Sequence, residues 1–167
     1  FQLAFLLQNL AGIHAPREKH RDDVELIFFP TGGGKTEAYL GVIAFTLLLR
    51  RIRGSTRPDA GLGVAVLLRY TLRLLTLDQL GRAATLVCAL ELLRQEFPAE
   101  LGEARFAVGL WVGRSATANT ISEVATKVTE YKNNRGPSPF PLTECPWCGR
   151  KLERDSLVMH PATKPQE

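Results

Sequence analysis

Residues 28–36 read Phe-Phe-Pro-Thr-Gly-Gly-Gly-Lys-Thr, an apolar run that ends in a glycine loop followed by lysine and threonine. Consecutive glycines allow backbone N–H groups to turn toward a polyphosphate. The ammonium group of Lys35 can reach the β and γ phosphates, and the hydroxyl of Thr36 can complete the coordination of Mg²⁺. The stretch therefore predicts a site for ATP and Mg²⁺, with Lys35 and Thr36 as its catalytic residues and Thr36 as the magnesium ligand.

The segments on either side of the loop support this interpretation. Residues 24–29 are mostly apolar and rich in branched and aromatic side chains, as expected for a parallel strand buried on both faces. Residues 37–50 contain no proline and one glycine, so we expect a helix there. Strand, loop and helix in this order direct a helix N-terminus at the phosphates. The general pattern G-x-x-x-x-G-K-[ST] would have glycine where this chain has Phe29.

Further apolar runs predict an α/β fold with a parallel sheet flanked by helices. Residues 64–68 and 105–112 are expected to form a second and a third strand. Additional helices are expected over residues 1–11, 72–95 and 120–132, the last of these starting with the spacing of a capping box.

Basic and hydroxyl side chains follow the second and third predicted strands. Arg69, Thr71 and Arg73 come after residues 64–68, and Arg114 follows the third strand. Because ligands bind at the carboxyl ends of parallel strands, these side chains are placed to contact the phosphates of DNA. Thr71 can also be read as an ordinary helix N-cap, which is compatible with a phosphate contact. The net charge of +4 supports a polyanionic partner only weakly.

A break in regular structure is predicted at residues 133–141, which contain three prolines and one glycine. We therefore expect an incomplete nucleotide-binding domain over residues 1–132, followed by a Pro-rich linker and half of a zinc knuckle over residues 133–167.

The knuckle is predicted from Cys145 and Cys148, which are separated by two residues and followed by a glycine. Such a pair can present two thiolates to one Zn²⁺. A redox Cys-x-x-Cys is the alternative, but it would be expected at a helix start after a strand rather than in a Pro-rich loop. We expect the missing ligands in a second cysteine pair beyond Glu167, because His160 has no companion ligand.

Composition is ordinary for a globular protein, with 45% hydrophobic and 23% charged residues in 167. The most apolar predicted helical segment, residues 38–49, is far shorter than the roughly 20 residues that span a bilayer. Three cysteines do not form a disulfide framework. We therefore expect a cytoplasmic protein without a membrane partner, and, since the chain lacks an initiating methionine, part of a longer polypeptide.

The form Pro-Thr-Gly-Gly-Gly-Lys-Thr resembles motif I of superfamily 2 helicases and translocases, and the turns after residues 68 and 112 resemble their DNA-contacting motifs. Residues 29–41, 67–77, 109–113 and 145–149 are similar to the helicase component of DISARM anti-phage defence systems. The resemblance implies the first RecA-like domain of an ATP-driven DNA motor, acting with other defence proteins that include a DNA methyltransferase.

The same resemblance implies that Gln2, which follows an aromatic residue, reads the edge of the adenine. A glutamine at a helix start can equally be a solvated surface residue. The full set of predicted nucleotide contacts is Gln2, Thr31, Gly32, Gly33, Gly34, Lys35, Thr36 and Glu37.

The chain also departs from the helicase pattern. No Asp-Glu-x-x box follows residue 113, and a second RecA-like domain with its arginine finger is absent. ATP hydrolysis is therefore expected of a longer protein, and this chain alone should be inactive. Two alternatives stay open: a non-motor P-loop NTPase or nucleotide kinase, and a zinc-dependent interaction module that retains a glycine loop.

Overall fold

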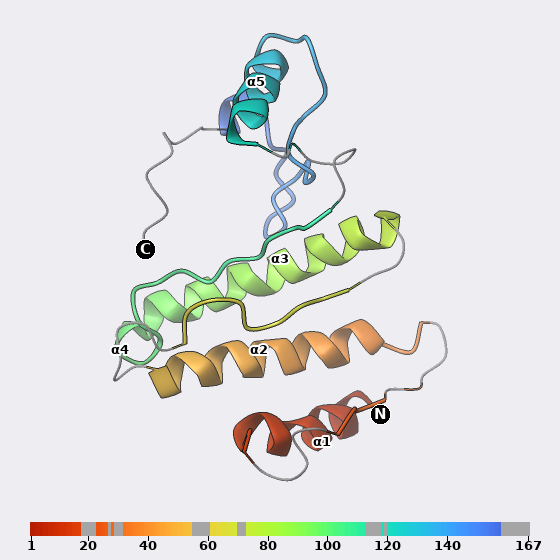
Figure 1. The fold of residues 1–167 in the computed structure, drawn as a ribbon, viewed down its shortest axis with the longest axis vertical. Helices are drawn as coiled ribbons and strands as arrows, with labels where there is room; N and C mark the ends of the chain where they lie inside the picture. Colours follow the sequence, from red (N-terminus) through yellow and green to blue (C-terminus); the bar gives the residue numbers. More distant parts are fainter. Residues whose placement is uncertain are drawn as a thin grey trace. The chain divides into compact units, whose positions relative to one another are not determined.

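The computed structural model describes residues 1–17, 23–26, 28, 32–54, 61–69, 73–112, 118 and 120–157, with backbone only for residues 73–76. The helices in this part of the chain are shown in Figure 1. They are α1 (Gln2–His14), α2 (Lys35–Gly54), α3 (Arg73–Glu96), α4 (Pro98–Leu101), α5 (Ile121–Lys132) and the short 3-10 helix η2 (Arg154–Ser156).

The predicted parallel sheet is wrong, and a RecA-like α/β fold is not shown. Within the described ranges there is no strand, only one isolated antiparallel bridge between Glu144 and Lys151. Residues 64–69 and 105–112 form no regular structure. Val64 and Leu67 are 76% and 88% exposed, whereas a parallel strand requires that both of its faces be covered.

Side chains of the helices form hydrogen bonds to backbone groups that a neighbouring strand would bond to in a sheet. The guanidinium group of Arg50 on α2 donates to the carbonyl oxygens of Leu62 (2.6 Å) and Val64 (3.1 Å). Backbone N–H and C=O groups need hydrogen-bond partners, and a long side chain can be such a partner where there is no neighbouring strand. The apolar run at residues 64–68 was therefore read correctly as non-helical but wrongly as a sheet strand.

The predicted helices are confirmed, with shifted ends. α2 starts two residues earlier than expected and α1 continues through Gly12 to His14. α3 ends at Glu96, and Pro98 occupies the first turn of α4, where its missing N–H leaves no helical bond unmade. At the start of α5 the hydroxyl of Thr120 accepts a hydrogen bond from the backbone N–H of Glu123 (3.2 Å), as the capping-box spacing predicted.

The chain divides into two compact units, each described here by itself. The first contains residues 1–70 and 86–107, and the second contains residues 71–85 and 108–167, so that α3 contributes to both. In the first unit α1 and α4 each pack against α2 (Figure 1). Its buried apolar residues are Ala38, Leu90, Leu101 and Phe106; those of the second unit are Ala83, Ala84 and Val128. The domain boundary after residue 132 stays a prediction.

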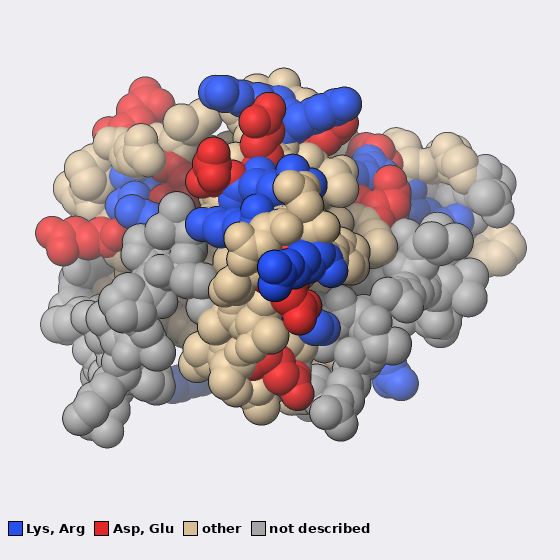
Figure 2. Space-filling model, turned by 90° about the horizontal axis from the view of Figure 1, so that it is seen from above, with Lys and Arg blue, Asp and Glu red and all other residues tan. Residues whose placement is uncertain are grey.

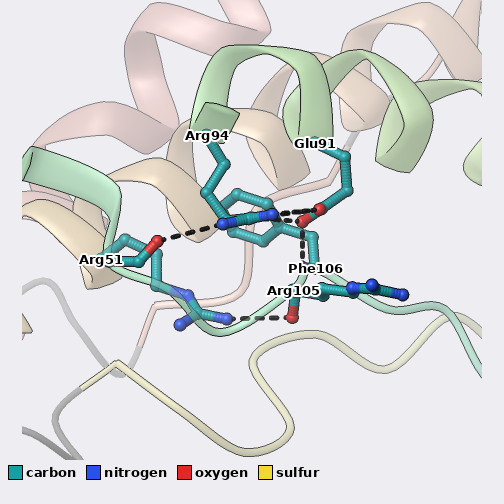
Figure 3. Close-up of polar contacts among 6 residues, drawn as sticks. Arg51, Glu91, Arg94, Arg105 and Phe106 are labelled. Carbon is teal, nitrogen blue, oxygen red and sulfur yellow. Dashed lines mark hydrogen bonds and ion pairs between the residues drawn. The ribbon is translucent and has the colours of Figure 1, made fainter. Parts of the chain in front are cut away.

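A polar cluster fastens residues 105–106 to helices of the first unit (Figure 3). The carboxylate of Glu91 forms an ion pair with Arg94 at 3.0 Å and accepts the backbone N–H of Phe106. Arg51 on α2 donates to the carbonyl oxygen of Arg105 (3.2 Å), and its guanidinium lies 5.0 Å from the centre of the Phe106 ring. These contacts replace a sheet ladder at the predicted third strand.

The environment of the cluster shifts the pKa values of two of its side chains. Burial alone would raise the pKa of Glu91, but hydrogen bonds from Arg94 and from the backbone N–H of Phe106 outweigh it, so the net shift is downward. Burial lowers the pKa of Arg51. Glu91 therefore stays ionised to a lower pH than an ordinary glutamate does.

Among the described helices, none has both the length and the apolar character needed to cross a bilayer.

Candidate nucleotide-binding site

Two of the three glycines in the loop have a backbone conformation that favours glycine. Gly32 and Gly34 have φ angles of +82° and +75°, in the left-handed region that favours glycine. α2 begins directly after the loop at Lys35, and its first helical hydrogen bond joins the N–H of Ala38 to the carbonyl of Gly34 (3.3 Å). The prediction that the loop leads into a helix is confirmed. The positive end of the dipole of this 20-residue helix therefore lies at the loop.

Gln2 lies against the loop although 31 residues separate it from Gly33 in sequence. Its side-chain amide donates a hydrogen bond to the carbonyl oxygen of Gly33 at 3.1 Å. A Cβ atom on Gly34 would be 2.3 Å from the amide nitrogen of Gln2, so the Gln2 side chain would have to move to admit a larger residue there. The packing of α1 on α2 thus brings Gln2 together with two predicted phosphate-binding residues. Its role in reading adenine stays a prediction.

Thr36 has a partner that sequence reasoning missed. Its hydroxyl lies 3.1 Å from the hydroxyl of Tyr39, one helical turn further along α2. The signal was the i, i+3 spacing, which places two side chains next to each other on a helix. A hydroxyl has one donor and two acceptor sites, so a Thr36 that donates to Tyr39 keeps lone pairs for a cation.

The remaining predicted nucleotide contacts are placed as follows. Lys35 is half-buried and Glu37 is exposed, both in the first turn of α2. Thr31 lies outside the described residues.

The residues present fit a nucleotide triphosphate and Mg²⁺ on chemical grounds. Two glycines with positive φ, a helix N-terminus, an ammonium group and a hydroxyl are the donor set that a polyphosphate and its cation require. This fit supports the predicted assignment, which stays a prediction.

The predicted DNA contacts are less well placed by the structure. Arg69 is exposed at the end of residues 64–69, and Arg73 is the first residue of α3. Thr71 and Arg114 lie outside the described residues. The sheet edge that was expected to group these side chains is not present in the described part of the chain, so this argument for their proximity is wrong.

On the face shown in Figure 2, the described charged residues are mixed in sign rather than segregated. Figure 2 shows lysine and arginine side chains interspersed with aspartate and glutamate on one face. The net charge of +4 therefore does not by itself identify a DNA-binding surface among the described residues.

Cys145 and Cys148 lie in a tight turn of the second unit. Cys145 is half-buried and Cys148 is exposed. The pKa of the Cys145 thiol is lowered by hydrogen bonds to its sulfur, first from the backbone N–H of Cys148 and then from that of Trp147. In the described ranges, no group of three or more histidine, cysteine or acidic side chains is arranged to hold a metal ion. The structure therefore offers a pair of thiols here, and His160 lies outside the described residues.

Comparison with known proteins gives one strong similarity. The chain is 42% identical over 158 residues to the DISARM protein DrmA of Bacillus paralicheniformis. The chain is similar to a DISARM protein. The match covers 90% of this chain but only 14% of the length of DrmA. No family model matches the chain. The predicted resemblance to a DISARM component is confirmed over this stretch, whereas membership of the helicase superfamily is not shown.

Proposed function

We propose that this chain is the ATP-binding part of an ATP-dependent DNA helicase or translocase that acts in DISARM anti-phage defence. The observation that carries the proposal is the glycine loop at the N-terminus of α2, with Gln2 hydrogen-bonded to Gly33. The similarity to DrmA supports the assignment to a DISARM system.

In this proposal the backbone of Gly32–Gly34 surrounds the phosphates and the ammonium group of Lys35 balances their charge. Thr36 supplies a hydroxyl ligand for Mg²⁺, held in orientation by Tyr39. When bound, Mg²⁺ neutralises charge on the transferred phosphoryl group. Thr31 and Glu37 complete the set of proposed contacts, and Gln2 recognises the base.

DNA is the proposed macromolecular partner, with Arg69, Thr71, Arg73 and Arg114 as contacts to its backbone. Other proteins of the defence system, including a DNA methyltransferase, are proposed as partners of the full-length protein. Hydrolysis requires an acidic residue that positions Mg²⁺ and an arginine from a second domain, so it is proposed for the full-length protein.

The test is whether DNA stimulates ATP hydrolysis by the full-length protein, with Arg69→Ala as the variant and Arg17→Ala, another exposed arginine, as the control. Arg69→Ala should weaken DNA binding equally for all sequences and reduce its salt dependence by about one counterion. Arg17→Ala should leave both unchanged. ATP hydrolysis that is indifferent to DNA would contradict the motor and favour a non-motor P-loop NTPase.

A further inference from the structure

The side chain of Gln2 meets the glycine loop at a single peptide unit. Its amide nitrogen donates to the carbonyl oxygen of Gly33 at 3.1 Å. The nitrogen and not the oxygen of the amide must face this carbonyl, because two oxygens at that distance would repel each other. The carbonyl group of Gly33 is therefore held toward α1.

A fixed carbonyl also fixes the N–H group of the next residue. In a planar trans peptide the C=O and N–H groups point in opposite directions. The N–H of Gly34 consequently points away from Gln2. Among the described residues, no backbone carbonyl accepts a hydrogen bond from this N–H. It can therefore donate to a ligand that lies on the side of the loop opposite Gln2.

The loop continues this arrangement into α2. Gly34 has a φ angle of +75°, and Lys35 is the first residue of the helix. A change from left-handed to right-handed backbone turns successive N–H groups toward one side, where they form a concave site for anions. The N–H of Gly34 is the first of this series. The orientation of the peptide between Gly33 and Gly34 thus determines whether the site has all of its donors.

Leu6 holds Gln2 in register with the loop. It follows Gln2 by one helical turn and lies on the same face of α1. A Cβ atom on Gly41 would be 2.7 Å from Cδ1 of Leu6, so the leucine occupies the space that this glycine leaves on α2. At the far end of α1, Nδ1 of His14 lies 2.9 Å from a guanidinium nitrogen of Arg53. These contacts hold α1 parallel to α2, with Gln2 at the loop (Figure 1).

We propose that Gln2 is a positioning residue for phosphate, which orients the peptide between Gly33 and Gly34 so that the N–H of Gly34 binds the nucleotide phosphates. Leu6 positions Gln2 for this contact. The inference rests on the proposed nucleotide site and gives Gln2 a role that does not involve the base. Both roles are compatible, because a glutamine amide that donates one hydrogen bond keeps a second N–H and its oxygen.

Tripolyphosphate with Mg²⁺ separates the two roles, because it carries the phosphates of ATP but has no base. Calorimetry measures the affinity for each ligand in wild type and in Gln2→Met, which keeps the length of the side chain but has no donor. We expect Gln2→Met to weaken both ligands by a similar factor of about 2 to 10. Gln8→Met on the same helix is the matched control and should change neither affinity, since Gln8 donates to Glu25. A loss for ATP alone would overturn the proposal.

A double-mutant cycle tests the part played by Leu6. Leu6→Ala should weaken tripolyphosphate binding less than Gln2→Met does. In the Gln2→Met background it should cause no further loss, because Leu6 acts through Gln2. Losses that add in the double variant would show that Leu6 does not position Gln2.

The amide signal of Gly34 in the nuclear magnetic resonance spectrum of the ligand-free chain gives a test that needs no nucleotide. A hydrogen bond to the carbonyl polarises the whole peptide unit, so Gln2→Met and Leu6→Ala should shift this signal in the same direction. An unshifted Gly34 signal in Gln2→Met would overturn the proposal. If tripolyphosphate binds equally to wild type and Lys35→Ala, the proposed nucleotide site is wrong, while the Gly34 signal still decides whether Gln2 orients the peptide.

Discussion

The side-chain amide of Gln2 donates a hydrogen bond to the carbonyl oxygen of Gly33, and the two atoms are 3.1 Å apart. This contact connects the first residue of α1 to the middle of the glycine loop. Helix α1 therefore holds the loop from one side while α2 continues it on the other. A substitution at Gln2 should therefore alter the affinity of the loop for nucleotide.

Replacing Gln2 with alanine should weaken ATP binding about 2- to 10-fold, the range expected for one or two hydrogen bonds. If Gln2 reads the base, the preference for ATP over GTP should fall as well. Competition between the two nucleotides, followed by fluorescence of a labelled ATP analogue, measures both effects. Gln8→Ala on the same helix is the control, because Gln8 donates to Glu25 instead of the loop. Equal losses for both variants would exclude a specific role of Gln2.

Alanine at Gly34 should be more harmful than alanine at Gly32. Both glycines have positive φ, which disfavours any other residue by about 1–2 kcal/mol. A Cβ on Gly34 would also displace the side-chain amide of Gln2 from its hydrogen bond to Gly33, whereas a Cβ on Gly32 meets nothing within 4 Å. Gly34→Ala should therefore reduce ATP affinity and stability more than Gly32→Ala, as measured by nucleotide titration and thermal unfolding. Gly109→Ala, in open space without positive φ, is the neutral control.

Glu91→Gln should destabilise the first compact unit in a manner that depends on pH. At pH 7 the loss of the charged contact to Arg94 should reduce the free energy of unfolding by about 1–3 kcal/mol, measured with urea. The pKa of Glu91 in the folded chain is below its usual value of 4.5. Its contribution is thus complete above that usual value and is lost as pH falls through the lowered pKa.

The difference between wild type and Glu91→Gln should consequently shrink when unfolding is measured in increasingly acidic buffer. Glu103→Gln, which alters an exposed carboxylate, is the matched control and should leave stability nearly unchanged. A difference that is the same at pH 7 and in acid would show that the charge of Glu91 is not what stabilises residues 105–106.

Thr120→Ala should destabilise α5 by about 1 kcal/mol, because it removes the side-chain acceptor for the N–H of Glu123. Thr126→Ala is a useful comparison, since Thr126 lies inside the same helix and bonds to the carbonyl of Ser122. Alanine has the higher helix propensity there, so that variant should be neutral or stabilising. Thermal unfolding followed by circular dichroism distinguishes the two, and the reverse order would contradict the cap.

The helices were predictable because their signals are local. Pro98 ends α3, Thr120 starts α5, and the glycines beside Lys35 fix the start of α2. The sheet was not predictable from apolar runs such as residues 64–68. A run of this kind shows that a segment is apolar and non-helical, but whether it pairs depends on partners far away in sequence.

In this chain, the hydrogen-bond partners of the two apolar runs are side chains of the helices and not strands. Arg50 supplies donors to residues 62 and 64, while Glu91 and Arg51 bond to the backbone of residues 105–106. Nothing in the spacing of these three residues distinguishes them from ordinary charges on a helix surface. The contact between Thr36 and Tyr39 did have a signal in its spacing, and that signal was missed.

The central claim is that residues 32–36 bind the phosphates of ATP. Its most direct test is the equilibrium affinity of the chain for ATP and for adenosine in the presence of Mg²⁺, compared between wild type and Lys35→Ala. Lys127→Ala, which removes an exposed lysine of α5, serves as the control. Wild type and the control should bind ATP more tightly than adenosine, and Lys35→Ala should lose most of that preference. An unchanged preference for ATP in Lys35→Ala would contradict the claim.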